Sequence, residues 1–267
     1  MKWARAIAVG VLLLTAVVSI AANFIAPAGY AHQFRTEPAA RPSKQHLLGT
    51  DDLGRDRLSR VIYGTRVSLI LAPAAALVAT ALAALIGGTA GFAGGWIESA
   101  MMAVTDLFLS LPWFFLLITV RALVPLNVPA MASVGITFVL LGCLGWAASA
   151  RVVCSDVRAM RNSDFILLAR AGGSGRWRLL MRHIVPNLRP LLLAQFWISI
   201  PTFILAEANL GMLGLGVAEP LPSWGSLLRE LQGAALAAHA WQFAPLVLFV
   251  AIVSCFHLVL TKEELPS

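Results

Sequence analysis

Charged residues are scarce in this chain. Asp, Glu, Lys and Arg make up only 12% of its 267 residues, whereas hydrophobic residues make up 59%. Soluble domains carry roughly 25% charged residues, so this shortage excludes an ordinary soluble domain. The mean hydropathy of +0.81 agrees, and together these values indicate a protein of the lipid bilayer.

Motifs for catalysis and nucleotide binding are also missing. The chain has no Gly-x-x-x-x-Gly-Lys-Ser/Thr loop to cradle phosphates, and the glycine-rich stretch 172–175 lacks the lysine. It has no His-Glu-x-x-His and no Gly-x-Ser-x-Gly. Its three cysteines lie in or beside apolar runs without metal-ligand spacing, and we interpret them as packing thiols: Cys143, Cys154 and Cys255. We therefore expect no catalytic site, no metal site and no bound cofactor.

The positive charge is concentrated in one segment. The formal net charge is +7, and between residues 151 and 189 eight arginines stand against only Asp156 and Asp164. An excess of arginine next to membrane spans is typical of a cytoplasmic loop, so we do not interpret it as a surface that binds nucleic acid.

Apolar runs of about 20 residues mark membrane-spanning helices. The first begins like a signal peptide, but it continues through Phe24 and Ile25, and we favour a retained helix. We predict cytoplasmic termini and six spans, at 6–27, within 66–98, and at 99–120, 130–153, 190–211 and 240–261. The predicted division is a tail and first helix at 1–27, an outer loop at 28–66, a five-helix core at 67–261 with a cytoplasmic loop at 154–189, and a short cytoplasmic tail at 262–267.

The arginine-rich segment 164–187 has the pattern of two short helices joined by glycines. In its second half the apolar residues recur at helical spacing and predict one apolar stripe: Trp177, Leu180, Met181 and Ile184. Gly172, Gly173 and Gly175 allow a sharp turn before that half, and Pro186 and Pro190 are expected to end the helix. Such a basic amphipathic helix fits either lipid headgroups or a protein partner.

Two longer segments are predicted to face outward. The first, 28–66, contains Asp51, Asp52 and Asp56 among arginines, and we interpret it as a solvated, self-paired loop, because the terminal glutamate of a calcium loop is absent. In the second, 211–239, glycines and prolines predict turns. Inside the spans, Asp106 and Glu207 are costly acids that fit either a transport path or a polar contact between helices.

The order of residues in the segment 164–187 resembles a known family. Asp164, the run 169–171 (Ala-Arg-Ala), Gly173 and the run 182–187 (Arg-His-Ile-Val-Pro-Asn) resemble the EAA loop of ABC importer permeases, which inserts into a groove on the partner ATPase. Where the family pattern has Glu-Ala-Ala, this chain has 167–169 as Leu-Leu-Ala. The resemblance implies these coupling residues: Asp164, Ala169, Arg170, Gly173, Arg178, Arg182, Pro186 and Asn187.

Further blocks extend the resemblance over most of the chain. They are 48–69 (LGTDDLGRDRLSRVIYGTRVSL), Gly94-Gly95-Trp96, Asp106, Pro112, 206–209 (Ala-Glu-Ala-Asn), 213–216 and 222–225. In this order they resemble the C-type subunit of the dipeptide and oligopeptide branch. We expect a translocation path or gate at Asp106, Glu207 and Asn209. The resemblance also implies an outer-loop motif: Gly49, Thr50, Asp51, Gly54, Arg55 and Asp56.

The resemblance implies an all-α, polytopic protein of the bacterial or archaeal cytoplasmic membrane, similar to type I ABC importer permeases. It implies uptake of short peptides, dipeptides first, by alternating access. The implied partners are a B-type permease, two ATPase subunits or domains that hold ATP and Mg²⁺, and an extracytoplasmic peptide-binding protein. Nickel chelates, glutathione or another small solute are alternative substrates. An integral-membrane enzyme and a passive channel are the competing classes.

Overall fold

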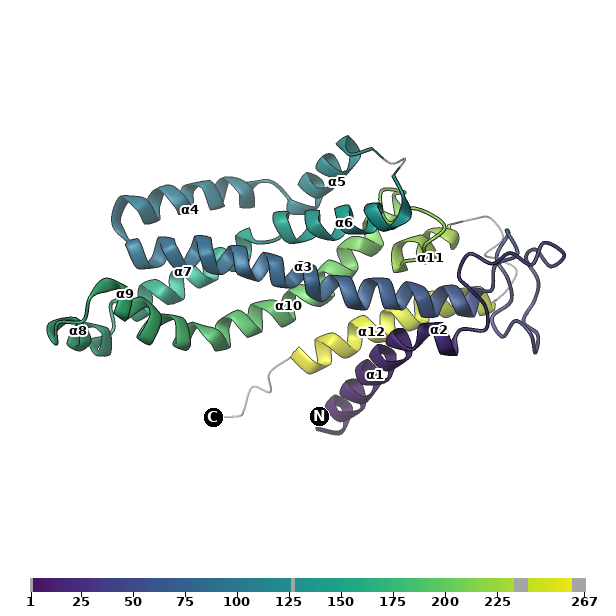
Figure 1. Cartoon of the computed structure of the whole chain (residues 1–267), viewed down its shortest axis with the longest axis horizontal. Helices are drawn as coiled ribbons and strands as arrows, with labels where there is room; N and C mark the ends of the chain where they lie inside the picture. The colour runs from purple at the N-terminus through teal and green to yellow at the C-terminus, as the bar shows by residue number, and fades with distance from the viewer. Residues whose placement is uncertain (1, 126–127, 233–239, 261–267) are drawn as a thin grey trace. The chain divides into compact units, whose positions relative to one another are not determined.

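A computed structural model describes residues 2–125, 128–232 and 240–260 (Figure 1). Within them the chain forms helices and two isolated antiparallel bridges, Gln33–Arg55 and Thr50–Asp56, and no strand. In chain order the helices are α1 (Lys2–Ile20), α2 (Ala22–Ile25), α3 (Arg57–Ala93), α4 (Gly95–Ser110), α5 (Trp113–Leu123), α6 (Ala130–Leu144), α7 (Ala147–Arg161), α8 (Asp164–Ala171), α9 (Arg176–Leu179), α10 (Val185–Met212), α11 (Trp224–Glu230) and α12 (Ala244–Leu260), with a π turn at Leu180–Ile184 and a 3-10 turn at Ala240–Phe243.

The helices confirm an all-α protein with several membrane spans. Five described segments are long and apolar enough to cross a bilayer: Trp3–Ile20, Arg57–Ala93, Ala130–Arg161, Arg176–Met212 and Trp241–Leu260. The predicted third span, 99–120, is instead a pair of helices, α4 and α5, bent by 79°. Pro112 lies at the break, where its missing N–H and its ring prevent a continuous helix. The pair makes a sixth span if it crosses as one unit.

The second span begins earlier than the sequence suggested. Helix α3 starts at Arg57, so residues 57–66, which were predicted to belong to the outer loop, are helical. Asp56 caps this start, because its Oδ2 accepts a hydrogen bond from the backbone N–H of Ser59 over 2.7 Å. The prediction took uncharged runs as spans, so it left these residues out of the second span. They include Arg60, whose charge is paired with acids within the fold.

The expectation that Pro186 and Pro190 end a helix is wrong. The chain continues from Arg176 to Met212 as one candidate span that includes both prolines. The π turn at Leu180–Ile184 immediately precedes Pro186. A π turn bonds residue i to i+5, and such local adjustments let a membrane helix continue past a proline.

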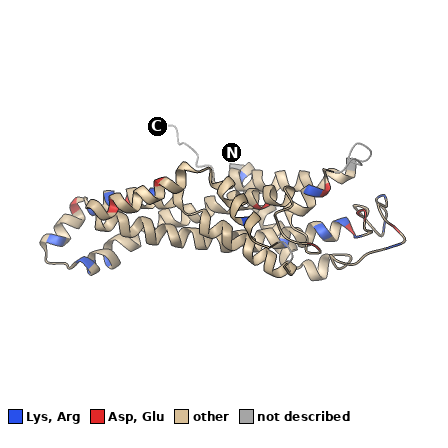
Figure 2. Cartoon of the chain, turned by 90° about the horizontal axis from the view of Figure 1, so that it is seen from above, with Lys and Arg blue, Asp and Glu red and all other residues tan. Residues whose placement is uncertain are grey.

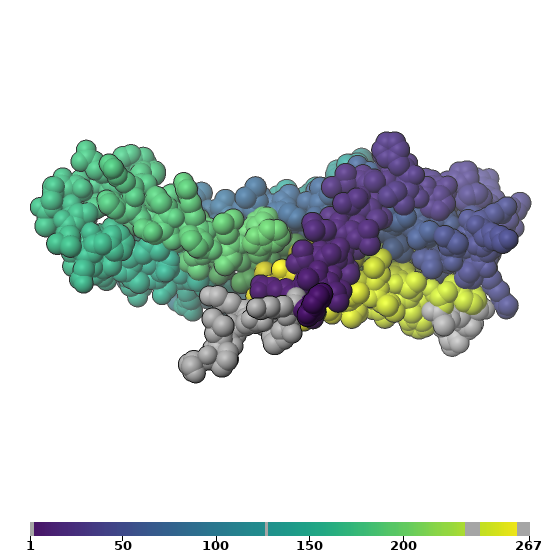
Figure 3. All heavy atoms as spheres, turned by 90° about the horizontal axis from the view of Figure 1, so that it is seen from below, coloured from purple at the N-terminus to yellow at the C-terminus, as the bar shows by residue number. Residues whose placement is uncertain are grey.

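The chain divides into two compact units. The first combines Met1–Ala72, Arg121–Phe138 and Pro201–Ser267, and the second combines Pro73–Val120 and Val139–Ile200. In the first unit α1 packs along α12 (Figure 3). Arg5 Nη2 donates to the carbonyl of Val259 over 2.6 Å. In the second unit α4 packs along α7.

Candidate functional site

The second unit carries a helical hairpin, residues 164–184, made of α8, a glycine turn, α9 and the π turn. Gly173 lies in the turn with φ of 80°, a conformation that costs other L-residues roughly 1–2 kcal/mol. The backbone N–H of Ser174 donates to the carbonyl of Ala169 over 3.1 Å and closes the turn. The predicted helix–glycine–helix arrangement is therefore confirmed.

An apolar cluster fixes the hairpin to the helices on either side of it. Its buried members come from α7, α8, α9, the π turn and α10: Val153, Val157, Ile166, Leu179, Ile184 and Leu188. Ala169, one of the predicted coupling residues, packs against this cluster from α8. Side chains from all five segments pack together in this cluster, so the hairpin is anchored to the end of α7 and the start of α10.

The predicted apolar stripe divides between two faces of the hairpin. Ile184 is buried and Leu180 packs against the cluster. In contrast, Trp177 is 71% exposed and Met181 is 45% exposed. The π turn adds a residue to the turn, so the spacing of a regular helix does not place these four side chains on one face. The exposed apolar surface consists of Phe165, Leu167, Leu168, Trp177 and Met181.

Basic residues surround that exposed surface. Arg170, Arg178 and Arg182 are exposed, as are Asp164, Gly173, Pro186 and Asn187. Figure 2 shows charged residues gathered along the hairpin and the adjoining part of α7. All eight predicted coupling residues therefore lie on the hairpin or at the start of α10. The hairpin therefore exposes apolar side chains and arginines together.

Ion pairs join α4 to α7 in the second unit, and one of them places Arg161 Nη2 3.9 Å from Glu98 Oε2. Asp106 pairs with Arg151, and Glu98 pairs with Arg158. The predicted path residue Asp106 thus lies in a contact between helices, with its side chain 47% exposed. Glu98 is 7% exposed, and it was missed because it served only to mark the end of an uncharged run.

The outer-loop motif in the first unit is self-paired, as predicted, but it is buried rather than solvated. Asp51 is 4% exposed, and its Oδ1 accepts from the backbone N–H groups of Leu53 and Arg55 over 2.9 and 2.8 Å. Its Oδ2 accepts from Arg55 Nε over 2.6 Å. Gly54 lies in this turn with φ of 75°. Protein donors therefore bind both oxygens of the Asp51 carboxylate.

A second set of acids completes this network. Arg55 Nη1 lies 2.5 Å from Glu219. Arg60, fully buried on α3, donates from Nη2 to Glu219 over 3.1 Å and to Glu230 over 2.6 Å. We refer to Asp51, Arg55, Arg60, Glu219 and Glu230 as the charge cluster. Sequence analysis missed Arg60, Glu219 and Glu230, although opposite charges in the two predicted outer segments were a usable signal.

Burial and charge shift the pKa of two members of the cluster. Burial lowers the pKa of Arg55, but hydrogen bonds and charges from Asp51 and Glu219 outweigh it, so the pKa lies above its usual value. Burial raises the pKa of Glu230, and the charge of Asp51 adds to the rise, while Arg60 and Arg55 oppose it. The protonation of Glu230 therefore depends on the charges of its neighbours in the cluster.

The remaining residues of the outer-loop motif hold the loop together. Thr50 Oγ1 accepts from the backbone N–H of Ala40 over 2.8 Å. Asp56 contacts His46 Nδ1 over 2.9 Å, and His46 Nε2 lies 3.4 Å from Glu37. No group of three or more His, Cys, Asp or Glu side chains in the described ranges is arranged to hold a metal ion.

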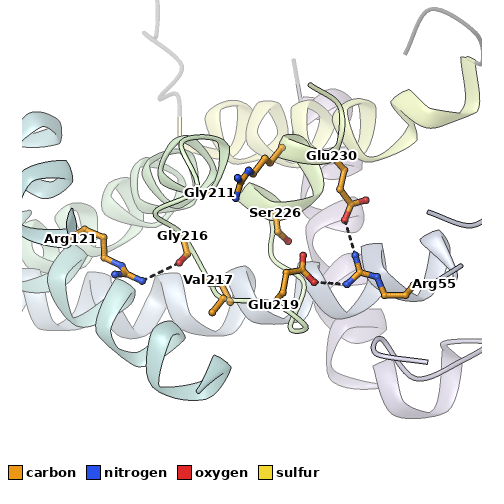
Figure 4. Close-up of a pocket in the computed structure, with 11 residues that line it drawn as sticks. Arg55, Arg121, Gly211, Gly216, Val217, Glu219, Ser226 and Glu230 are labelled. Carbon is orange, nitrogen blue, oxygen red and sulfur yellow. Dashed lines mark hydrogen bonds and ion pairs between the residues drawn. The ribbon is translucent and has the colours of Figure 1, made fainter. Parts of the chain in front are cut away.

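A cavity of about 520 Å³ lies beside the charge cluster, within the first unit (Figure 4). Its lining comes from the outer loop, α5, the end of α10, the following loop and α11: Arg55, Arg121, Gly211, Gly214, Gly216, Val217, Ala218, Glu219, Ser226, Arg229 and Glu230. Binding sites for small molecules occupy roughly 300–1,000 Å³, so the volume suits a small solute.

Glu207, the other predicted path residue, is buried beside this cavity and not among its lining residues. It is 0% exposed, and Ser68 Oγ donates to its Oε2 over 3.1 Å. A Cβ on Gly225 would lie 2.8 Å from the Glu207 carbonyl oxygen, so only glycine allows this approach of α11 to α10. Asn209, the third predicted path residue, is exposed on α10. Glu207 belongs to the first unit and Asp106 to the second.

The chain also matches known proteins over most of its length. Residues 83–261 match the family model described as "Binding-protein-dependent transport system inner membrane component". The chain is 31% identical over 242 residues to the dipeptide transport system permease protein DppC of Bacillus subtilis, covering 91% of this chain and 74% of that protein. It is 30% identical over 254 residues to DppC of Haemophilus influenzae, covering 93% of this chain and 84% of that protein.

A third relative is named for oligopeptides rather than dipeptides. The chain is 33% identical over 218 residues to the oligopeptide transport system permease protein OppC of Mycobacterium bovis, covering 81% of this chain and 73% of that protein. The family match and these relatives agree with the apolar helices and the hairpin in indicating a multi-pass transport subunit. The chain belongs to the family of binding-protein-dependent transport system inner membrane components.

Proposed function

We propose that this chain is the C-type permease subunit of an ATP-driven importer that carries short peptides, with dipeptides as the first choice. The observation that carries the proposal is the agreement between the hairpin and the relatives, which are named as dipeptide and oligopeptide permeases. Nickel chelates, glutathione or another small solute are the alternative cargo for the same architecture.

The proposed partners follow from what the chain lacks and what it exposes. Its sequence holds no phosphate-binding loop, so two partner ATPases bind ATP and Mg²⁺. A B-type permease pairs with this chain in the lipid bilayer, and a peptide-binding protein delivers cargo from outside. In this arrangement both termini and the hairpin are cytoplasmic, while the charge cluster and its cavity face outward.

The hairpin couples ATP binding to movement of the permease. Trp177, Met181 and the nearby arginines contact a groove of the ATPase, and closure of the ATPases on ATP pushes the hairpin. The buried cluster around Leu179 and Ile184 passes this push to α7 and α10. ATP can favour one permease conformation only through contacts that differ between the two states, and a hairpin with a packed base provides such contacts.

The test is ATP-dependent uptake of labelled dipeptide into proteoliposomes that contain this chain and the four proposed partners. Gly173→Asp and Arg182→Glu should abolish most uptake while the complex still assembles. Arg66→Glu is the matched control, because it also reverses the charge of one arginine but lies outside the hairpin. Arg66 Nη1 donates to Asn23 Oδ1 over 3.1 Å. Uptake that is indifferent to ATP and to both hairpin variants would reject the importer and favour a channel, and turnover of a substrate without ATPases would favour an enzyme.

A further inference from the structure

The cavity in the first unit has an unusual cation in its wall. Arg121, near the end of α5, is 1% exposed. Its Nη2 lies 3.2 Å from Ser133 Oγ and 3.3 Å from the carbonyl oxygen of Gly216. Its Nε and Nη1 have no hydrogen-bond partner among the described residues, and no carboxylate there forms an ion pair with it.

A buried arginine without a counter-charge lowers the stability of the folded protein. Burying a charge without a paired counter-charge is unfavourable, and buried donors without acceptors are rare in folded proteins. Every buried arginine of the charge cluster, by contrast, has carboxylate partners. Arg121 therefore has two donor groups without acceptors and no counter-charge among the described residues, and an anion in the cavity would supply both.

The two sides of the cavity differ in charge. Figure 4 shows Arg121 at one side, beside Gly216, and Arg55 with Glu219 and Glu230 at the other. The charge cluster contains three carboxylates against two guanidinium groups, so it carries an excess of negative charge. Arg229, which is exposed, is a third arginine of the lining besides Arg55 and Arg121. A ligand with a carboxylate at one end and an ammonium group at the other matches this division.

We propose that Arg121 binds the terminal carboxylate of a short peptide in this cavity, with the amino end of the peptide towards Glu219 and Glu230. The inference rests on the proposed function, and it adds a binding site within this chain and a polarity for the peptide. Hydrogen bonds between guanidinium and carboxylate groups are short and about twice as strong as neutral ones. A carboxylate supplied by an acidic residue of the binding protein has the same chemistry, so the test separates these two sources.

The experiment places a reporter thiol in the cavity wall. Ala218→Cys is introduced into a chain whose three native cysteines are replaced by alanine, and the complete transporter is reconstituted without the binding protein. The rate of labelling by N-ethylmaleimide is then measured at increasing concentrations of alanyl-alanine or of its carboxyl-terminal amide. In a separate arm it is measured with the peptide-free binding protein added. ATP-dependent uptake, with the binding protein added, is measured in the same preparation.

We expect alanyl-alanine to slow the labelling at a concentration about tenfold or more below that of the amide, since a hydrogen bond to a charged group has this weight. Arg121→Gln should remove the difference between the two ligands. Arg121→Lys should retain part of it, and the control Arg66→Gln should retain all of it. The comparison of peptide with amide in the unaltered protein is informative even if Arg121→Gln fails to assemble.

Three outcomes would overturn the inference. They are equal protection by peptide and amide, no protection by either, and protection that requires the peptide-free binding protein, which would assign the carboxylate to that protein. If uptake proceeds while one of these is found, only the carboxylate site is rejected. If protection depends on the carboxylate but ATP-driven uptake is absent, the site stands and the proposed function is rejected.

Discussion

Arg60 at the start of α3 donates a hydrogen bond to Glu230 at the end of α11 over 2.6 Å, although 170 positions separate them in the chain. The Arg60 side chain is fully buried and that of Glu230 is 24% exposed. The pair therefore ties the segment after α10 to the start of the second span. Within the first unit, this bond and the two bonds to Glu219 hold one wall of the cavity in place.

The first prediction concerns the stability that this pair gives to the first unit. Arg60→Ala leaves the carboxylate of Glu230 without its nearest buried counter-charge and takes one of two arginine partners from Glu219, and loss of one partner of a buried pair costs about 3–5 kcal/mol. We expect a loss of that size in thermal or denaturant unfolding of the reconstituted protein. Arg66→Ala is the control, and equal losses for both variants would show that the burial of Arg60 has no special energetic weight.

The second prediction is a pH dependence that arises from Glu230. Its pKa is raised from 4.5 by burial and by Asp51, against the opposing charges of Arg60 and Arg55. Between pH 4.5 and the raised pKa, the folded protein holds a proton that the unfolded chain releases, so the free energy of unfolding falls as the pH rises. Glu230→Gln removes this titration.

The unfolding midpoint of Glu230→Gln should therefore vary less with pH across that window than the midpoint of the unaltered protein. The measurement is a series of unfolding curves from acidic to neutral pH, with Glu37→Gln as a control in the same outer region. If the two variants follow the unaltered protein in parallel, Glu230 does not titrate in the way that its surroundings indicate.

The third prediction separates the two faces of the hairpin. Leu179 is 1% exposed in the cluster at the base, whereas Trp177, two positions before it, is 71% exposed. Leu179→Ala should destabilise the second unit by about 2–5 kcal/mol, because it opens a cavity in a packed core. Trp177→Ala should change stability by less than about 0.5 kcal/mol, yet lower dipeptide uptake at least tenfold if this side chain contacts the ATPase.

Unfolding curves and uptake assays on the same two variants test this division. Loss of stability in Trp177→Ala would show that this tryptophan contributes to the packing of the hairpin. Unchanged uptake in Trp177→Ala, with the complex assembled, would remove it from the coupling surface.

Features that depend on local sequence could be predicted, and features that depend on distant pairing could not. Uncharged length located the membrane helices, and the glycine turn at 172–175 revealed the hairpin. The pairs of Arg60 with Glu219 and Glu230 join residues 159 and 170 positions apart, and no local pattern reports such a distance. The π turn at Leu180–Ile184 was also invisible, because it departs from the spacing by which helices are recognised.

The same limit applies to Asp106 and Glu207. Sequence analysis could say only that an acid in an apolar span is costly, and it left a transport path and a helix contact open for each acid. The structure pairs Asp106 with Arg151 and buries Glu207 against Ser68. Asp106 thus has a counter-charge, whereas Glu207 Oε1 has no hydrogen-bond partner among the described residues, and an experiment must decide whether either acid has a further role.

The fourth prediction makes that decision for Asp106. If its role is to hold α4 against α7, the charge reversals Asp106→Arg and Arg151→Asp should each impair the protein, and the double variant should restore both stability and uptake. The coupling energy should be near 1 kcal/mol or below, because both side chains are partly exposed. If Asp106 instead contacts the passing solute, the double variant should recover its stability but not its uptake, because the negative charge has moved to the other helix. Unfolding and uptake measured on all four proteins of the cycle therefore distinguish a helix contact from a transport path.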